Sequence, residues 1–519
     1  MSKKETNSQT PEVATAKRFS ARLDGYFEIS KRGSTFRTEI IAGIVTFLAM
    51  CYILTVNPNQ FFYASTAEPK WTAVFMSTAF GAIIGTLLMA FLAKLPLAQA
   101  PGMGLNSLVG SIIGGGVGAY AYNFTFSLGN AMLMVLISGV IFLLLSVITI
   151  KGVSLRQIIF EGIPESIRMA IPVGIGLFIA FIGFQNAKVI VDNPYTLVDL
   201  ATFSNLFTGD VNVKLNLYNA IVCFFGLIVI AILSHLKVKG AVIFGILAAT
   251  LFGIPLGVTN LSVITGSVDG ISWKFWENFG NYFAGENSVF AICFTEGFPM
   301  PKGSLFTVFM LVITMSMIDM FDTMGTCVGC CSAAGLMDEK GTPINYDKIM
   351  YADSIATCAG AVMGTSTVTT FVEAGSGIAA GGKTGLTALV AALMFLLSIF
   401  LLPVFAMIPS AAAASALVYV GVLMLGGVKD IDFKDVSSAV PSFLAIVIMP
   451  LGYSITKGIG MAILSYVVIC VFSYVFELIV YAVKKGKKEE CEKPVWKISL
   501  VTLIIAALFV VYFFVPTVL

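Results

Sequence analysis

The 519-residue sequence has little charge and almost no histidine. Charged residues make up 12% of it and hydrophobic residues 57%, whereas a soluble protein has about 25% charged residues. The mean hydropathy is +0.93, and the apolar residues form long blocks, which predicts an integral membrane protein with many spans. A single histidine, His235, argues against a metal site or catalytic triad built on histidine. The net charge of +2 gives no basic surface for nucleic acid.

Cysteine is also scarce, and its placement predicts packing. The nine cysteines lie mostly inside apolar runs and do not form a disulfide framework. The one cluster, Cys327, Cys330 and Cys331 in GTCVGCC, is expected to pack between membrane helices as small, soft side chains. We therefore predict no metal and no cofactor. The first 37 residues are polar and basic without an apolar core, so no cleavable signal is expected.

Fifteen apolar segments are long enough to cross a membrane fully or half way. They begin near Thr38, Trp71, Pro101, Gly129, Ile167, Asn216, Gly240, Ser304, Met350, Glu373, Thr384, Ala411, Pro441, Gly458 and Ile498. If the N-terminal tail is cytoplasmic and the chain changes sides at each segment, most of the 31 lysines and arginines lie in the cytoplasm. This is the positive-inside bias, and a miscounted segment would destroy it.

The order of these segments indicates an inverted repeat. Fourteen precede the KKGKK run at Lys484 and divide into halves of seven, at about 38–257 and 304–482. Because seven is odd, the second half must enter the membrane from the opposite side. The third segment of each half is short and rich in glycine, a pattern typical of the binding site of secondary transporters. The last segment, 498–514, has no counterpart and is expected to be peripheral.

Two acids stand within one span, in SMIDMFDTMGT. Asp319 and Asp322 would each cost about 2.5–3.5 kcal/mol at the membrane centre, so a function is expected. They are three residues apart and share a helix face, which Thr326 continues. Such carboxylates can exchange protons. Alternatively, one aspartate caps a broken helix or pairs with a lysine.

Glu373 is the third candidate acid. It follows GTSTVTTFV, which favours extended backbone, and precedes AGSGIAAGG, where a half-helix is expected to begin. The helix dipole favours an acid at this position, although simple capping would explain it too. Extended backbone inside a membrane is tolerated only where it lines a cavity, and a polar ligand would use its free groups.

The matching segment of the first half reads LPLAQAPGMGLNSLVG. Pro101 restricts the chain before the half-helix, and Gly102 and Gly104 permit close backbone approach. Asn106 offers two donors and an acceptor to a ligand, or it ties neighbouring helices together.

Three other features receive a structural interpretation. GIAAGGKT at 377–384 matches the phosphate-loop pattern, but that loop needs a soluble α/β domain, which this chain does not supply. Lys383 is expected at the cytoplasmic end of the half-helix. Glu477 is interpreted as an interface residue, and Asp353 as a cap at the cytoplasmic start of its span.

These motifs carry a resemblance to a known family. GIVTFLAMCYILTVNP, LPLAQAPGMGLN, FDTMGT, GTSTVTTFVEAGSGIAAGGKTGLTA and PSFLAIVIMPLGYSITKGI are similar to the AzgA-like purine permeases of the nucleobase–cation symporter-2 superfamily. The resemblance runs from about Tyr26 to Val483. It implies an all-α, fourteen-span, seven-plus-seven inverted-repeat fold with core and gate domains, commonly as a homodimer. It also implies proton-coupled uptake of hypoxanthine, guanine or adenine.

The resemblance implies a division of the chain and a set of site residues. The expected parts are the N-terminal tail 1–37, core 38–150, gate 151–258, extracytoplasmic loop 259–303, core 304–409, gate 410–483, and basic linker with extra helix 484–519. The family's substrate carboxylates fall on Asp322 and Glu373, and its third-segment glycine and asparagine on Gly104 and Asn106. Ser107 stands where alanine is expected and could alter substrate preference.

The leading hypothesis is therefore a proton–purine symporter of the plasma membrane with a cytoplasmic N-terminus. Two acids, an amide and free backbone groups complement a purine's ring donors and acceptors. Phe321 or Phe371 could stack on the ring, and Asp319, Asp322 or Glu373 could carry the proton. The expected partners are a purine, the coupling cation (H⁺ favoured over Na⁺), membrane lipid and a second copy of the chain. The alternatives are a carrier for uracil or xanthine on the same fold, and a channel. A membrane enzyme is a third alternative, but the sequence lacks a nucleophile–base pair for it.

Overall fold

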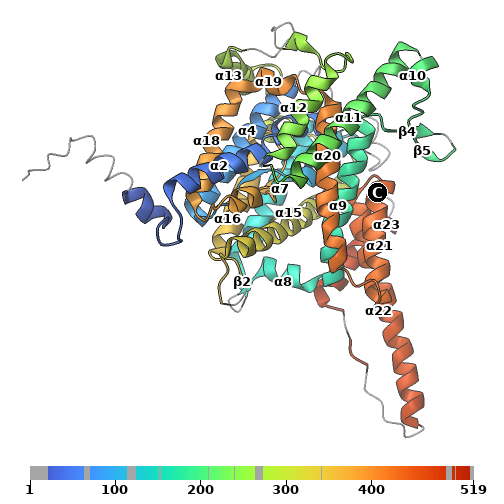
Figure 1. Ribbon diagram of the computed structural model, residues 1–519. Helices are drawn as coiled ribbons and strands as arrows, with labels where there is room; N and C mark the ends of the chain where they lie inside the picture. The colour runs from blue at the N-terminus through green and yellow to red at the C-terminus, as the bar shows by residue number, and fades with distance from the viewer. Residues whose placement is uncertain are drawn as a thin grey trace, which may run out of the picture.

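The structure is a computed structural model in which helices make up most of the chain (Figure 1). It describes residues 21–62, 70–113, 124–150, 153–193, 195–208, 210–238, 240–263, 273–339, 342–486, 494–496 and 498–514. The helices before the long 259–303 loop are α2 (Phe36–Met50), α3 (Ile53–Phe61), α4 (Trp71–Leu88), α5 (Met103–Ile113), α7 (Leu128–Val147), α8 (Leu155–Gly162), α9 (Glu165–Asn186), α10 (Asn205–Thr208), α11 (Val211–His235) and α12 (Ala241–Gly253).

The later helices begin in that loop and continue to the C-terminal segment. They are α13 (Phe275–Ala284), α14 (Ile292–Thr295), α15 (Leu305–Ala334), α16 (Tyr346–Met363), α17 (Ala374–Ala379), α18 (Gly385–Ser398), α19 (Leu402–Ala406), α20 (Ser410–Leu425), α21 (Val436–Leu451), α22 (Ile455–Gly486) and α23 (Leu500–Phe514). The strands are β1 (Gln99–Pro101), β2 (Thr149–Ile150), β3 (Val153–Ser154), β4 (Ile190–Asn193), β5 (Leu197–Leu200) and β6 (Val368–Thr370).

The apolar segments read from the sequence correspond to helices. Within the described ranges, nine helices or joined helices are long and apolar enough to cross a membrane, and four more are shorter and apolar. The predicted starts at Trp71, Ser304 and Thr384 fall on the first residue or the N-cap of a helix. The mainly helical, multi-pass membrane architecture is therefore confirmed.

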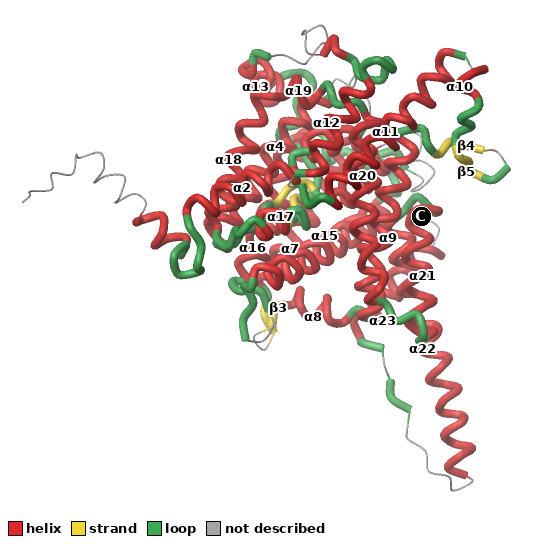
Figure 2. Tube along the Cα trace, in the orientation of Figure 1, coloured by secondary structure: helices red, strands yellow, loops and turns green. Residues whose placement is uncertain are grey.

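The two interrupted segments meet at the centre of the molecule. β1 and β6 pair antiparallel, with Gln99 opposite Thr370 and Pro101 opposite Val368. α5 and α17 begin shortly after these strands, and Figure 2 shows the strand pair surrounded by helices. Each strand supplies the other with the backbone partners that a membrane interior does not offer. Because the strands are antiparallel, the short helices α5 and α17 begin at opposite ends of the strand pair.

Two groups of helices surround this crossing. In the first group α2, α4, α7, α15, α16 and α18 pack on one another, and α4, α15 and α16 also pack on the strand pair. In the second group α9, α11, α12, α20, α21 and α22 pack on one another. Glycines permit the close contacts: a Cβ on Gly176 of α9 would lie 2.5 Å from Met424, and one on Gly43 of α2 would lie 2.5 Å from Val390.

The segment that matches the phosphate-loop pattern is occupied by a carboxylate of the protein itself. Buried Glu39 accepts hydrogen bonds from the backbone N–H groups of Lys383 (3.0 Å) and Thr384 (3.2 Å), and from the Thr384 hydroxyl at 2.8 Å. These N–H groups at the start of α18 would be the ones to hold a phosphate. The segment therefore acts as a helix start capped by Glu39.

The segments outside the two repeats pack on the helices that they flank. In the 259–303 loop, Tyr282 of α13 donates to the Met363 carbonyl at 2.7 Å. The extra C-terminal helix α23 lies against α22, α15 and α8. Thr502 of α23 donates to the Gly162 carbonyl at 2.7 Å, which satisfies the C-terminal end of α8.

Candidate binding site

A cavity of about 680 Å³ lies between the strand crossing and the second helix group. From the first group it is lined by Ala49, Met103, Gly104, Ile318, Asp322, Thr370, Phe371, Val372, Glu373, Gly375, Ser376 and Ala379. From the second group it is lined by Ile175, Ile179, Ser234, Lys237, Val238, Gly240, Ala241, Val242, Tyr419, Val420, Leu423 and Met424. Its volume is within the 300–1,000 Å³ of ordinary small-molecule sites.

Two carboxylates from different helical segments of the second half face this cavity. Asp322 comes from the middle of α15, and Glu373 directly precedes α17. The Tyr52 hydroxyl donates to Glu373 Oε1 at 2.5 Å, and the Thr369 hydroxyl lies 3.4 Å from Asp322 Oδ2. Glu373 makes no side-chain cap for α17, so capping does not explain this acid. Both residues are only half-buried, and a ligand in the cavity can reach them.

Glycines keep the first half-helix close to the cavity. A Cβ on Gly104 would lie 2.8 Å from Ile175 Cγ2 of α9, and a Cβ on Gly102 would lie 2.9 Å from Thr369 Oγ1. Both contacts are shorter than real Cβ atoms tolerate, so neighbouring groups would have to move. The sequence expectation of close approach at these positions is met, and Gly104 itself lines the cavity.

The other predicted site residues take different positions. Asn106 is fully buried, donates to the Pro101 carbonyl at 3.2 Å and accepts from the Ser366 hydroxyl, so it ties β1–α5 to the segment before β6. Thr326 is buried on α15 outside the cavity lining. Phe371 lines the cavity, whereas the side chain of Phe321 lies outside the described part of the structure.

Ser107, the departure from the family pattern, has a local structural role. Its hydroxyl accepts from Gln60 Nε2 at 2.8 Å and donates to the Met103 carbonyl at 3.0 Å. It is buried and does not line the cavity. Ser107 therefore joins α5 to α3 and has no contact with the space where a ligand would bind.

Sequence reasoning missed several lining residues and one residue that holds a lining carboxylate. Tyr52, which holds Glu373, lies in the AMCYILTVNP motif but carries no charge that would single it out. Met103, Ile175, Ile179 and Met424 line the cavity as ordinary apolar residues of helices. No pattern within a single sequence separates such residues from those that face lipid.

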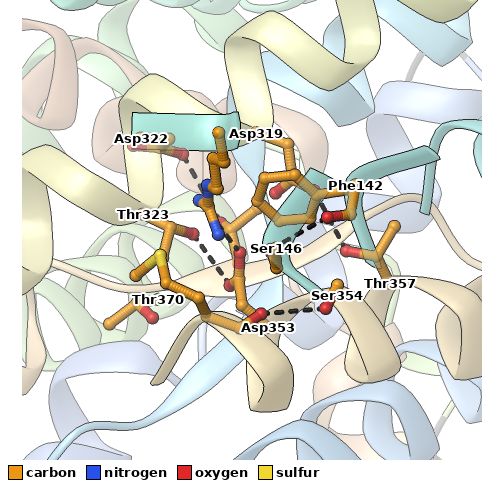
Figure 3. A network of polar contacts seen from close by, with 12 residues as sticks. Phe142, Ser146, Asp319, Asp322, Thr323, Asp353, Ser354, Thr357 and Thr370 are labelled. Carbon is orange, nitrogen blue, oxygen red and sulfur yellow. Dashed lines mark hydrogen bonds and ion pairs between the residues drawn. The ribbon is translucent and has the colours of Figure 1, made fainter. Parts of the chain in front are cut away.

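A second polar cluster, around Asp319 and Asp353, lies next to the strand pair (Figure 3). Asp353 is fully buried in α16, eight residues beyond the N-cap Asn345. It accepts from Thr323 and from Gln99 Nε2, both at 2.8 Å. Asp319 is fully buried as well, and Thr357 donates to its Oδ2 at 3.1 Å. The interpretation of Asp353 as a helix cap is therefore replaced by an interior role.

The fold and site define a class: a multi-pass membrane protein with crossed half-helices and a central polar cavity between two helix groups, which is the arrangement of a carrier. The chain matches the Permease family over residues 37–461 and belongs to it. The protein is therefore a transporter, and the resemblance drawn from its motifs is confirmed.

Relatives in other organisms support this assignment over nearly their full length. The chain is 37% identical to a putative permease of Methanocaldococcus jannaschii over 87% of this chain and 93% of that one. It is 36% identical to the adenine permease AdeP of Escherichia coli (86% and 90%). It is 34% identical to the guanine/hypoxanthine permease PbuG of Bacillus subtilis (85% and 92%).

Solved structures agree on the fold. The transmembrane domain of the cyanobacterial bicarbonate transporter BicA has a TM-score of 0.55 at 16% identity, covering 82% of this chain and 97% of that one. The murine anion transporter Solute Carrier 26 family member A9, in an inward-facing state, has a TM-score of 0.55 at 12% identity, covering 91% and 74%. At these identities the similarity concerns the fold alone.

Proposed function

We propose that the protein takes up purine nucleobases together with protons across the plasma membrane by alternating access. The observation that carries this proposal is that Asp322 of α15 and Glu373, which directly precedes α17, face one cavity at the strand crossing. A purine presents ring N–H donors, for which carboxylates are strong acceptors. The adenine and guanine/hypoxanthine permeases among the relatives support a purine as the substrate.

The proposed architecture has fourteen spans as two inverted repeats of seven, followed by the extra helix. The core domain comprises 38–150 and 304–409, and the gate domain comprises 151–258 and 410–483. The division is supported by the two helix groups and by the cavity between them. The N-terminus is placed in the cytoplasm. Lys237 of the α11–α12 connection lines one end of the cavity, so this end faces the cytoplasm, and a homodimer is the proposed assembly.

Equilibrium binding of labelled adenine, guanine, hypoxanthine and uracil to the purified protein tests the substrate. We expect at least one purine to bind saturably and uracil to compete weakly. Preference for uracil would assign the protein to the pyrimidine carriers of the same fold. Flux that does not saturate, accompanied by current, would indicate a channel.

Uptake into cells tests the coupling. If Asp319, Asp322 or Glu373 carries the proton, purine accumulation should rise as external pH falls and should collapse when an uncoupler is added. Replacing sodium by choline should leave accumulation unchanged. Accumulation that persists with the uncoupler and requires sodium would contradict proton coupling.

Filling the space at Gly104 should weaken purine binding. Gly104→Ala places a Cβ 2.8 Å from Ile175 Cγ2, and overpacking of this kind costs about 1–3 kcal/mol. We expect affinity to fall by about tenfold, and Gly104→Ala with Ile175→Ala to recover much of it. Gly325→Ala is the matched control on α15, because its Cβ meets no atom within 4 Å. An affinity equal to that of the parent in Gly104→Ala would argue against this cavity.

A further inference from the structure

A buried arginine lies in the polar cluster next to the strand pair. Arg156 belongs to α8, the helix between the first core segment and the first gate segment, and only 1% of its side chain is exposed. Its Nη2 lies 4.0 Å from Asp353 Oδ2, and its guanidinium lies 3.7 Å above the Phe142 ring. Its three nitrogens make no hydrogen bond in the structure. This guanidinium is stabilised by its ion pair and its contact with an aromatic ring, but it donates no hydrogen bond. Burying it in this way costs free energy of folding, which suggests that it has a function.

The cluster contains two carboxylates and one permanent cation. Asp353 faces Arg156 and accepts two hydrogen bonds. Asp319 accepts one, from Thr357, and its Oδ1 is buried without a partner. With all three groups ionised the cluster would carry an uncompensated negative charge, which a dry interior disfavours. One added cation makes it neutral. Asp353 Oδ2 and Asp319 Oδ1 both lack a hydrogen bond, but Asp353 Oδ2 has Arg156 beside it, so Asp319 Oδ1 is the atom that we assign to the proton.

Other ionisable groups face the cluster from the elements packed around it. They are Asp322 and Cys327 on α15, and Tyr346 and Cys358 on α16. None of these is a second permanent cation, so Arg156 alone sets the positive charge among the described residues of the cluster.

The strand pair connects this cluster to the cavity. Gln99 of β1 donates to Asp353 and lies 3.4 Å from Thr370 Oγ1 of β6. The preceding residue of β6, Thr369, lies 3.4 Å from Asp322 Oδ2. Thr370 also lines the cavity, so β6 contacts both sites. A chain of side-chain contacts therefore runs from the cavity to Asp353.

We propose that Asp319, Asp353 and Arg156 form a coupling-ion site separate from the purine cavity. Arg156, beside Asp353, supplies the fixed positive charge that a bound sodium ion would otherwise have to supply. Asp319 carries one exchangeable proton: its O–H bond forms when a proton enters from outside, and breaks when that proton is released to the cytoplasm. The inference rests on the proposed transport of purines, and it makes the coupling proton-specific and independent of sodium.

The first test uses Asp319→Asn in full-length protein reconstituted into liposomes. Asparagine keeps the size of the side chain and its bond from Thr357 but cannot carry an exchangeable proton. We expect purine binding and purine–purine exchange within about threefold of the parent, and accumulation driven by an inward proton gradient reduced by about tenfold or more. Proton-driven accumulation equal to that of the parent would overturn the proposal.

The second test removes the internal cation. Arg156→Gln leaves the carboxylates without a fixed cation, so transport in sodium-free medium should fall by about tenfold or more, and added sodium should restore part of it. Arg156→Lys should retain activity without sodium, because it keeps the charge. Arg37→Gln, an exposed arginine of α2, is the control for loss of one arginine.

The outcomes separate this inference from the proposed function. Failure of the parent to bind any purine would refute the proposed function and be seen before any variant is made. A parent that binds purines but requires sodium refutes the ion site and the proton coupling, whereas purine transport itself still stands. The same holds if Arg156→Gln is folded, as judged by size exclusion and purine binding, yet transports like the parent without sodium. If Arg156→Gln does not fold, Asp319→Asn alone decides.

Discussion

Replacing Glu373 by glutamine is expected to weaken purine binding by about ten- to hundredfold. Glutamine keeps the shape and can still accept the bond from Tyr52 through its oxygen, but its amide presents a donor where the carboxylate had an acceptor. A purine N–H would then meet an N–H, and an unpaired buried donor costs about 1–3 kcal/mol. Equilibrium binding of the preferred purine to the purified variant measures the effect.

Two further variants locate this effect at Glu373. Glu477→Gln changes an exposed acid of α22 in the same way and should bind like the parent. Tyr52→Phe removes the hydroxyl that lies 2.5 Å from Glu373 Oε1 and should give a smaller loss, because the carboxylate remains. Parent-like affinity in Glu373→Gln would remove this residue from the substrate site.

The crossed half-helices could be predicted because their sequences conflict with continuous helix. Proline and glycine around Pro101, and the β-branched run before Glu373, both favour extended backbone. Each of these interruptions occurs once, in the third segment of its half. Their matching positions therefore predict both the inverted repeat and the place of the binding site. The structure places β1 and β6 at these two points.

Residues whose role depends on a distant partner could not be predicted in the same way. Arg156 reads as a cytoplasmic loop cation and Asp353 as a cap, because each is near the end of an apolar segment. Only the packing of α8 against α7 and the depth of α16 bring the two within 4.0 Å. Asn106 was open to two readings, and its contacts with Pro101 and Ser366 favour the tie between segments.

The two aspartates of α15 differ in what they face, although they are three residues apart. Asp322 is half-buried and lines the cavity, whereas Asp319 is fully buried and bonded to Thr357 on α16. A helix turns about 100° per residue, so small differences in angle and depth decide which acid meets the ligand. This geometry supports the choice of Asp322 as the substrate carboxylate.

Asp322→Asn should therefore lose purine affinity by about ten- to hundredfold, while Asp319→Asn should remain close to the parent. At position 322 the asparagine N–H would face a purine ring N–H, so two donors would meet. At position 319 the asparagine lies outside the cavity and does not meet the purine. Both variants keep the side-chain volume, so expression and size-exclusion behaviour should match the parent. Binding of the preferred purine to both purified variants makes the comparison. The opposite order, with Asp319→Asn failing and Asp322→Asn binding normally, would show that the cavity and the motif alignment assign the wrong aspartate.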